Sequence, residues 1–168
     1  MSGVVVRAAQ KQDFTEIALI YEHYVLHSCS TFETEAPPAE EMLQRREAIL
    51  AQGLPYLVAE ANRRVVGYAY ASAYRQRAAY RFTVEDSVYV DVAQLGRRYG
   101  RTLLAALIAV CEAGPWRQMV AVIGDSANAA SVALHERMGF RRVGVLEGVG
   151  YKLGRSVDTV LMQRALKG

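Results

Sequence analysis

The segment from Leu95 to Arg101 combines two glycines with three arginines and comes directly before an apolar helical pattern. The free N–H groups and the dipole at a helix N-terminus attract anions, and guanidinium groups add positive charge. We therefore expect this turn to bind a pyrophosphate. It is not a Walker A loop, because no Gly-Lys-Ser/Thr follows, and its glycine spacing does not fit the dinucleotide fingerprint. A solvated arginine cluster at a strand-to-helix turn is the alternative.

The elements that position this turn alternate between strand and helix patterns. Runs rich in β-branched and aromatic residues predict strands, and apolar residues spaced three and four apart predict helices. The predicted strands cover residues 4–7, 56–60, 65–72, 80–90, 119–123, 140–149 and 156–166. The predicted helices cover 13–27, 37–50, 103–111 and 128–138, and Asp13 with Glu16 has the spacing of a capping box at the first of them. This order predicts one α/β (α+β) domain over residues 1–168, with a mixed central sheet and helices on both faces.

Length and composition exclude several other classes of protein. With 168 residues, 52% of them apolar, the chain can bury one substantial core. Its net charge of +3 gives no broad basic field, so we expect no nucleic-acid partner. Residues 1–10 lack the pattern of a signal peptide, and no run of about 18 apolar residues occurs, so we expect a cytoplasmic protein without a membrane partner. Cys29 and Cys111 lack metal-ligand companions, so we expect no metal and interpret both as packing residues.

Other segments stand in a specific order around the glycine- and arginine-rich turn. They are Thr83–Val90 before it and, after it, a last helix that carries Asn128, Ser131, Leu134 and His135 ahead of Gly139 and Phe140. In order and spacing they resemble the GCN5-related N-acetyltransferase (GNAT) superfamily, and more narrowly its phosphinothricin and methionine sulfoximine acetyltransferase branch. The resemblance extends over nearly the whole chain. It implies an acyl-CoA N-acyltransferase-like fold with a mostly antiparallel sheet, acetyl-CoA as co-substrate, a small-molecule amine acceptor and a homodimer.

The resemblance also implies which residues contact acetyl-CoA. The strand at Val88–Val90 would splay from its neighbour, so that its free backbone groups pair with the pantetheine arm and hold the oxyanion. Two positions depart from the superfamily pattern: Leu95 stands where arginine or glutamine is usual, with Gln94 one residue early, and Arg98 stands where glycine is usual. A left-handed backbone at Arg98 would cost about 1 to 2 kcal/mol. For Asn128, a helix cap is the alternative role. The expected cofactor-binding residues are Val88, Tyr89, Val90, Gly96, Arg97, Arg98, Tyr99, Gly100, Arg101, Asn128 and Ser131.

The catalytic and acceptor residues follow from the same resemblance. An amine must lose its proton before it attacks a thioester, and Glu85, just before the cofactor strand, is the expected base; a surface ion pair is the alternative. His135 stands where many members have a tyrosine that protonates the thiolate, and we leave open whether it is an acid or a packing residue. Asp86 points to the opposite strand face and ranks below Glu85 as a base. The expected acceptor-binding residues are Phe32, Arg75, Arg77, Tyr80, Glu85, Asp86 and Ser87.

The sequence thus predicts an acetyl-CoA-dependent N-acetyltransferase for the α-amine of a small amino-acid-like acceptor, such as methionine sulfone, methionine sulfoximine or phosphinothricin. A protein or peptide N-acetyltransferase of the same fold is the enzymatic alternative. A non-catalytic acetyl-CoA sensor would tolerate both the unusual turn and the absent tyrosine. A nucleic-acid-binding module is disfavoured by the small net charge.

Overall fold

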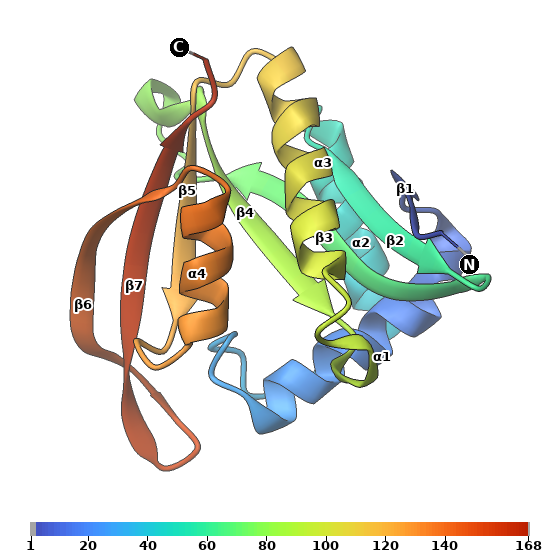
Figure 1. Ribbon diagram of the computed structural model, residues 1–168, viewed down its shortest axis with the longest axis horizontal. Helices are drawn as coiled ribbons and strands as arrows, with labels where there is room; N and C mark the ends of the chain where they lie inside the picture. The colour runs from blue at the N-terminus through green and yellow to red at the C-terminus, as the bar shows by residue number, and fades with distance from the viewer. Residues whose placement is uncertain (1–2, 168) are drawn as a thin grey trace.

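The fold, seen in a computed structural model, is described for residues 3–167, so the outermost ends of the expected domain lie outside the described residues. Seven strands form one sheet in the order β1-β2-β3-β4-β5-β7-β6 (Figure 1). Neighbouring strands are antiparallel except for the parallel pair β4 and β5. The strands are β1 (Val5–Ala8), β2 (Tyr56–Ala61), β3 (Arg64–Ala73), β4 (Thr83–Val90), β5 (Gln118–Gly124), β6 (Arg141–Lys152) and β7 (Arg155–Ala165).

Four α-helices cover the two faces of the sheet in the described chain: α1 (Phe14–His27), α2 (Ala39–Ala51), α3 (Tyr99–Ala113) and α4 (Ala129–Arg137). Two adjacent residues of β4 show which helices share a face. The ring of Tyr89 lies 5.3 Å from the ring of Tyr24 in α1, whereas Val90 lies beside Gly100 of α3, which also neighbours Leu134 of α4. Because successive strand residues point to opposite faces, α1 covers one face and α3 with α4 the other.

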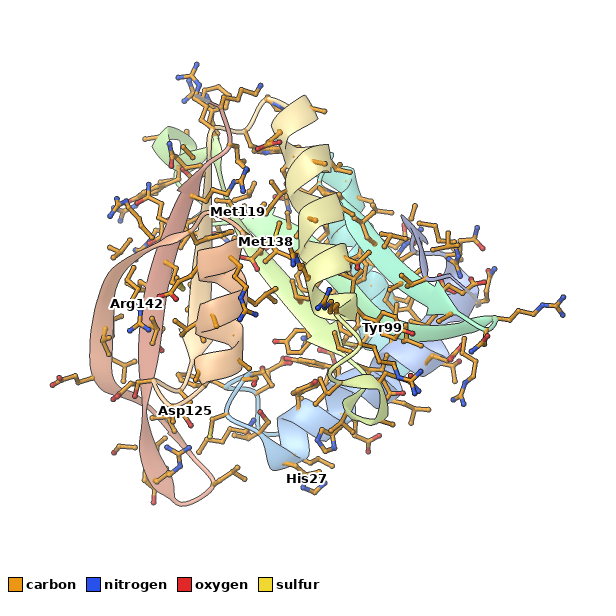
Figure 2. The ribbon with its side chains drawn as sticks, viewed as in Figure 1. His27, Tyr99, Met119, Asp125, Met138 and Arg142 are labelled. Carbon is orange, nitrogen blue, oxygen red and sulfur yellow. The ribbon has the colours of Figure 1, made fainter. Side chains whose placement is uncertain are left out.

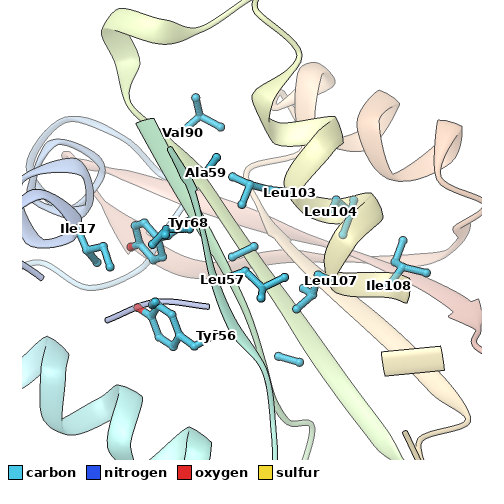
Figure 3. Packing of buried hydrophobic residues seen from close by; sticks show 14 of the residues in the cluster. Ile17, Tyr56, Leu57, Ala59, Tyr68, Val90, Leu103, Leu104, Leu107 and Ile108 are labelled. Atoms are coloured by element: carbon cyan, nitrogen blue, oxygen red, sulfur yellow. The ribbon is translucent and has the colours of Figure 1, made fainter. Parts of the chain in front are cut away.

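The core lies between the sheet and these two helical layers. In α3, Leu103, Leu104 and Leu107 are fully buried on one side of the sheet, while Ile17 and Tyr68 are buried on the other (Figure 3). Fully burying a leucine side chain contributes about 1.5 to 3 kcal/mol. Burial of these leucines therefore fixes the rotation of α3 about its axis. The first turn of the helix lies beside the end of β4, where Gly100 neighbours Val90.

The sheet opens between β4 and β5. The two strands pair only where Thr83–Glu85 lie beside Gln118–Val120. Beyond that point, in the described chain, β4 pairs with β3 alone and β5 with β7 alone, and Figure 1 shows the two strands diverging. Unpaired backbone groups in the interior of a sheet need another partner, so the opening is suited to a ligand that carries amides.

The predicted fold class and its helices on both faces are confirmed, with two local corrections. The strand predicted from residue 80 begins at Thr83, because Ala78–Tyr80 form a 3₁₀ turn. The predicted capping box is wrong. Asp13 instead accepts hydrogen bonds from Arg7 at 2.8 and 2.9 Å, and Glu16 accepts one from the Val65 N–H at 3.2 Å. Asp13 also accepts from the Gln10 N–H at 2.7 Å, so it caps the 3₁₀ turn Lys11–Asp13 instead of α1, whereas Glu16 is held by a partner that is distant in the sequence.

Candidate active site

A cleft of about 910 Å³ occupies the opening between β4 and β5. Its walls come from β4, β5, the turn before α3, the first turns of α4 and the loop after α1. Figure 2 shows Tyr99, which begins α3, and Asp125, which precedes α4, at the same end of the molecule. The diverging strands and the starts of two helices therefore meet at one site.

The turn before α3 has the geometry of an anion site. Arg98 adopts the left-handed conformation, with φ of 65° and ψ of 14°, and the helix begins at the next residue. The N–H of Thr102 bonds to the Arg98 carbonyl, so by helix geometry the preceding N–H groups of the first turn have no partner within α3. A Cβ at Gly100 would make only ordinary contacts at 3.6 Å. Arg98, Arg101 and Arg137 are among the residues that line the same cleft.

Asn128 and Tyr24 organise the edges of the cleft. The Asn128 side chain accepts a hydrogen bond from the Ser131 N–H at 3.3 Å and donates one to Ser30 Oγ at 3.5 Å. It therefore caps α4 as well as lining the cleft. The Tyr24 hydroxyl donates to the Val90 carbonyl at 2.5 Å, which ties α1 to the end of β4.

Glu85 lies in the cleft as a half-buried carboxyl group. Burial, with a smaller contribution from the negative charge of neighbouring Asp86, raises the pKa of Glu85 from 4.5 to about 7. A carboxyl group with this pKa exchanges protons readily near neutral pH, as a general base must. Because side chains alternate along β4, Glu85 and Tyr89 lie on the same face of the strand, which is the face that α1 covers.

Asp86 and His135 form a buried pair on the other face. The side chains are 2% and 5% exposed, and His135 Nε2 lies 2.9 Å from Asp86 Oδ2. His135 Nδ1 lies 2.7 Å from the Ser131 carbonyl. Burial by itself lowers the pKa of His135, but the hydrogen bond and the charge of Asp86 outweigh burial and raise that pKa above its ordinary value.

Comparisons with known proteins decide the family. Residues 6–161 match the family described as the acetyltransferase (GNAT) domain. The chain belongs to the GNAT acetyltransferases. A phosphinothricin N-acetyltransferase of Alcaligenes faecalis is 52% identical over 96% of this chain and 82% of its own. An L-methionine sulfoximine/L-methionine sulfone acetyltransferase of Salmonella typhimurium is 39% identical over 97% of this chain and 95% of its own. The crystal structure of a phosphinothricin acetyltransferase from Sinorhizobium meliloti, in complex with AcCoA, superposes with a TM-score of 0.95 at 43% identity, covering 99% of this chain and 90% of that chain.

In this GNAT acetyltransferase most of the residues predicted for the site line the cleft. They are Glu85, Asp86, Ser87, Val88, Tyr89, Val90, Gly96, Arg98, Tyr99, Gly100, Arg101, Asn128, Ser131, His135 and Phe32. Arg97 is exposed and is not part of the cleft lining. The prediction that Asp86 binds the acceptor is not supported, because its carboxylate is buried against His135 of α4, on the strand face opposite Glu85.

Three residues predicted to bind the acceptor lie elsewhere in the GNAT fold. Arg75 and Arg77 line a separate hollow of about 300 Å³ that also contains Trp116. The guanidinium of Arg75 lies over the rings of Tyr74 and Tyr80, at 5.3 and 5.9 Å from their centroids. Within the described chain, the Arg75 loop therefore makes no part of the cleft wall.

One wall of the GNAT cleft, on the side of α1, is aromatic and was not among the predicted site residues apart from Phe32. Tyr21, Tyr24 and Tyr70 line it together with Phe32. The Tyr21 hydroxyl lies 2.8 Å from Thr31 Oγ1, which holds the loop that carries Phe32. Helical spacing marks Tyr21 and Tyr24 as facing inward, but it does not distinguish a cleft wall from the core.

Two further findings bear on the character of the protein. No helix of residues 3–167 is both long enough and apolar enough to cross a membrane. Within the same residues, no group of three or more His, Cys, Asp or Glu side chains is placed to hold a metal ion.

Proposed function

We propose that this enzyme transfers the acetyl group of acetyl-CoA to the α-amine of a small amino-acid-like acceptor, such as methionine sulfoximine, methionine sulfone or phosphinothricin. The single observation that supports the acetyl transfer best is the position of Glu85. Its carboxyl group has a pKa of about 7 and lies in the cleft where β4 leaves β5, beside the anion-binding start of α3. The similar proteins with known acceptors support the acceptor class.

Acetyl-CoA fits the cleft in three respects. The turn from Gly96 to Arg101 offers free N–H groups and guanidinium charge to the pyrophosphate. The unpaired edge of β4 at Val88–Val90 offers backbone groups to the amides of the pantetheine arm. The cleft volume of about 910 Å³ leaves room for both the co-substrate and the acceptor.

The chemistry of the transfer depends on β4, which contributes both a carboxyl group and backbone N–H groups to the cleft. Glu85, on the acceptor side, takes the proton from the ammonium group, and the free amine then attacks the thioester carbonyl. Backbone N–H groups of β4 stabilise the negative charge that develops on the carbonyl oxygen. Both ring nitrogens of His135 are engaged, one by the Ser131 carbonyl and the other by Asp86, and the thiolate of coenzyme A is a fair leaving group without a side-chain acid.

The aromatic wall favours a small acceptor over a protein terminus. Phe32 closes this side by resting against Gly150 of β6, where even a Cβ atom would lie 2.4 Å from the ring. Thiol release should therefore be measured with methionine sulfoximine, phosphinothricin and a peptide with a free N-terminus. We expect much higher kcat/KM for the small amino acids. Preference for the peptide would support a protein N-acetyltransferase, and tight acetyl-CoA binding without turnover would support a sensor.

We propose that the enzyme is a homodimer and that it is cytoplasmic. Strand β6 is an edge of the sheet, and it exposes apolar side chains such as Val143, Val145 and Tyr151, which are 52%, 46% and 75% exposed. A self-complementary contact with a second copy would cover this edge. Sedimentation of the wild type and of Val145→Asp tests the contact, with the variant expected to shift toward monomer. The buried free thiols of Cys29 and Cys111 favour a reducing compartment.

A further inference from the structure

Lys152, at the end of β6, is a buried cation. Of the three lysines in the chain, Lys11 and Lys167 are exposed, whereas Lys152 is only 5% exposed. Its Nζ atom donates hydrogen bonds to the Thr31 carbonyl at 2.7 Å and to the Tyr24 carbonyl at 3.3 Å. Taking an ammonium group out of water costs free energy, and burial accordingly lowers the pKa of Lys152. The two carbonyls offset this cost.

These carbonyls belong to the end of α1 and to the loop that follows it. Tyr24 lies in the last turn of α1, where the helix dipole favours a cation. Thr31 comes directly before Phe32, which lines the cleft. Lys152 therefore ties β6 both to the end of α1 and to the residue that carries Phe32 into the cleft wall.

The ring of Phe32 lies against two glycines. A Cβ atom at Gly150 of β6 would overlap the ring, and one at Gly124 of β5 would lie 3.1 Å from it. The loop backbone is close to the sheet as well, because the same Cβ at Gly124 would overlap the Cys29 carbonyl oxygen. Figure 1 shows the loop after α1 beside the hairpin of β6 and β7. The ring thus has a defined seat on the sheet.

The other anchors of this segment come from the helices. The Tyr21 hydroxyl of α1 lies 2.8 Å from Thr31 Oγ1. Arg45 of α2 donates to the carboxylate of Glu33 at 2.7 and 3.1 Å. These bonds hold the segment to α1 and α2, whereas the bond from Lys152 holds it to β6, the strand that carries Gly150. Removing the ammonium therefore releases Phe32 on the side of its glycine seat.

We propose that Lys152 is a positioning residue for the acceptor, which holds the Thr31 carbonyl so that Phe32 stays against Gly150 and closes the acceptor end of the cleft. The inference rests on the proposed function. A lysine suits the task because its ammonium is a compact charge with three donors, which can serve two carbonyls in different directions. Lys152 itself lies outside the cleft lining, so it acts through Thr31 and Phe32.

Nuclear magnetic resonance tests the position of Phe32 without any turnover. The chain has four phenylalanines, so the ring signals of protein labelled with ¹³C in phenylalanine are assigned with Phe32→Leu. In the wild type we expect one set of Phe32 ring signals, with a nuclear Overhauser contact to the α-protons of Gly150. In Lys152→Met, which removes the ammonium but keeps an unbranched side chain, this contact should be lost. The matched control is Lys167→Met, since Lys167 donates to the Gly114 carbonyl at the surface, and it should keep the contact.

Kinetics then test whether the position of Phe32 matters to the acceptor. In Lys152→Met the KM of methionine sulfoximine should rise about tenfold or more, as expected for the loss of a hydrogen bond from a charged group. The KM of acetyl-CoA and the kcat at saturating acceptor should stay close to those of the wild type and of Lys167→Met. The preference for methionine sulfoximine over a peptide amine, measured as a ratio of kcat/KM, should fall. A purely structural role for Lys152 would reduce kcat and the affinities for both substrates together.

Three results would overturn the proposal. One is a wild-type Phe32 ring with no contact to Gly150 or with two sets of signals, which is decisive even if Lys152→Met fails to fold. Another is a folded Lys152→Met in which the contact persists. The third is a lost contact with an unchanged acceptor KM, which would show that the seat of Phe32 does not serve the acceptor. If no acceptor is acetylated, the proposed function fails, while the resonance experiment still reports whether Lys152 holds Phe32 in place.

Discussion

Replacing the candidate base, Glu85→Gln, should lower activity and raise stability in the same variant. The amide keeps the size of the side chain but accepts no proton, so turnover at neutral pH should fall by about 10² to 10⁴. The loss should shrink as the pH approaches the pKa of the acceptor amine, because more of the amine is then free without help. The stability should change because ionising the partly buried carboxyl group costs free energy in the folded protein.

The size of the stability change follows from the pKa of Glu85, which burial raises from 4.5 to about 7. Below pH 4.5 the carboxyl is neutral in both states. Between pH 4.5 and 7 it ionises in the unfolded chain first, so the wild type loses stability as the pH rises, and above pH 7 the loss is complete. A shift of this size corresponds to at most about 3.4 kcal/mol, and solvent screening of the half-buried group reduces it to about 1 to 2 kcal/mol.

Urea unfolding at pH 5 and pH 8 measures this difference. Glu85→Gln should be more stable than the wild type at pH 8 by about 1 to 2 kcal/mol, equivalent to roughly 3 to 6 °C in Tm, and nearly equal to it at pH 5. Glu22→Gln, which replaces an exposed carboxylate of α1, is the control and should show no such pH dependence. An equal difference at both pH values would refute the raised pKa, and wild-type turnover in Glu85→Gln from pH 6 to 9 would refute its role as base.

Three other substitutions test the walls of the cleft. Gly100→Asp should abolish measurable acetyl-CoA binding by calorimetry while Gly100→Ala, whose Cβ has room, should keep it; equal affinities would contradict the pyrophosphate site. Arg98→Gly should relieve the left-handed strain and raise the free energy of unfolding by about 0.5 to 1 kcal/mol, whereas Arg98→Ala should not, and denaturant midpoints decide between them. Gly150→Ala should displace Phe32 and raise the acceptor KM without changing that of acetyl-CoA, in contrast to Gly144→Ala, which has open space; equal acceptor KM values would remove Phe32 from the acceptor wall.

Local physical chemistry let the sequence determine much of the fold. Apolar spacing located α1 and α3, because one face of each must be buried, and the Pro37–Pro38 pair marked the start of α2. Alternation along the strand placed Glu85 and Asp86 on opposite faces. The resemblance to the GNAT turn, in which glycine is usual at this position, implied a left-handed backbone at Arg98, and φ there is 65°.

Tertiary structure alone decided which groups meet. Asp86 finds His135 across 49 positions of sequence, and Glu16 near the start of α1 likewise finds the Val65 N–H across 49 positions instead of the helix terminus. Strand alternation tells which residues share a face but not which helix covers that face, so the partner of Asp86 was not predictable from its own segment. For the same reason the Arg75 loop, a plausible wall of the acceptor site by composition, lies beside Trp116 at a separate hollow. The position of a loop depends on how the whole sheet and its helices pack, and no local pattern encodes that.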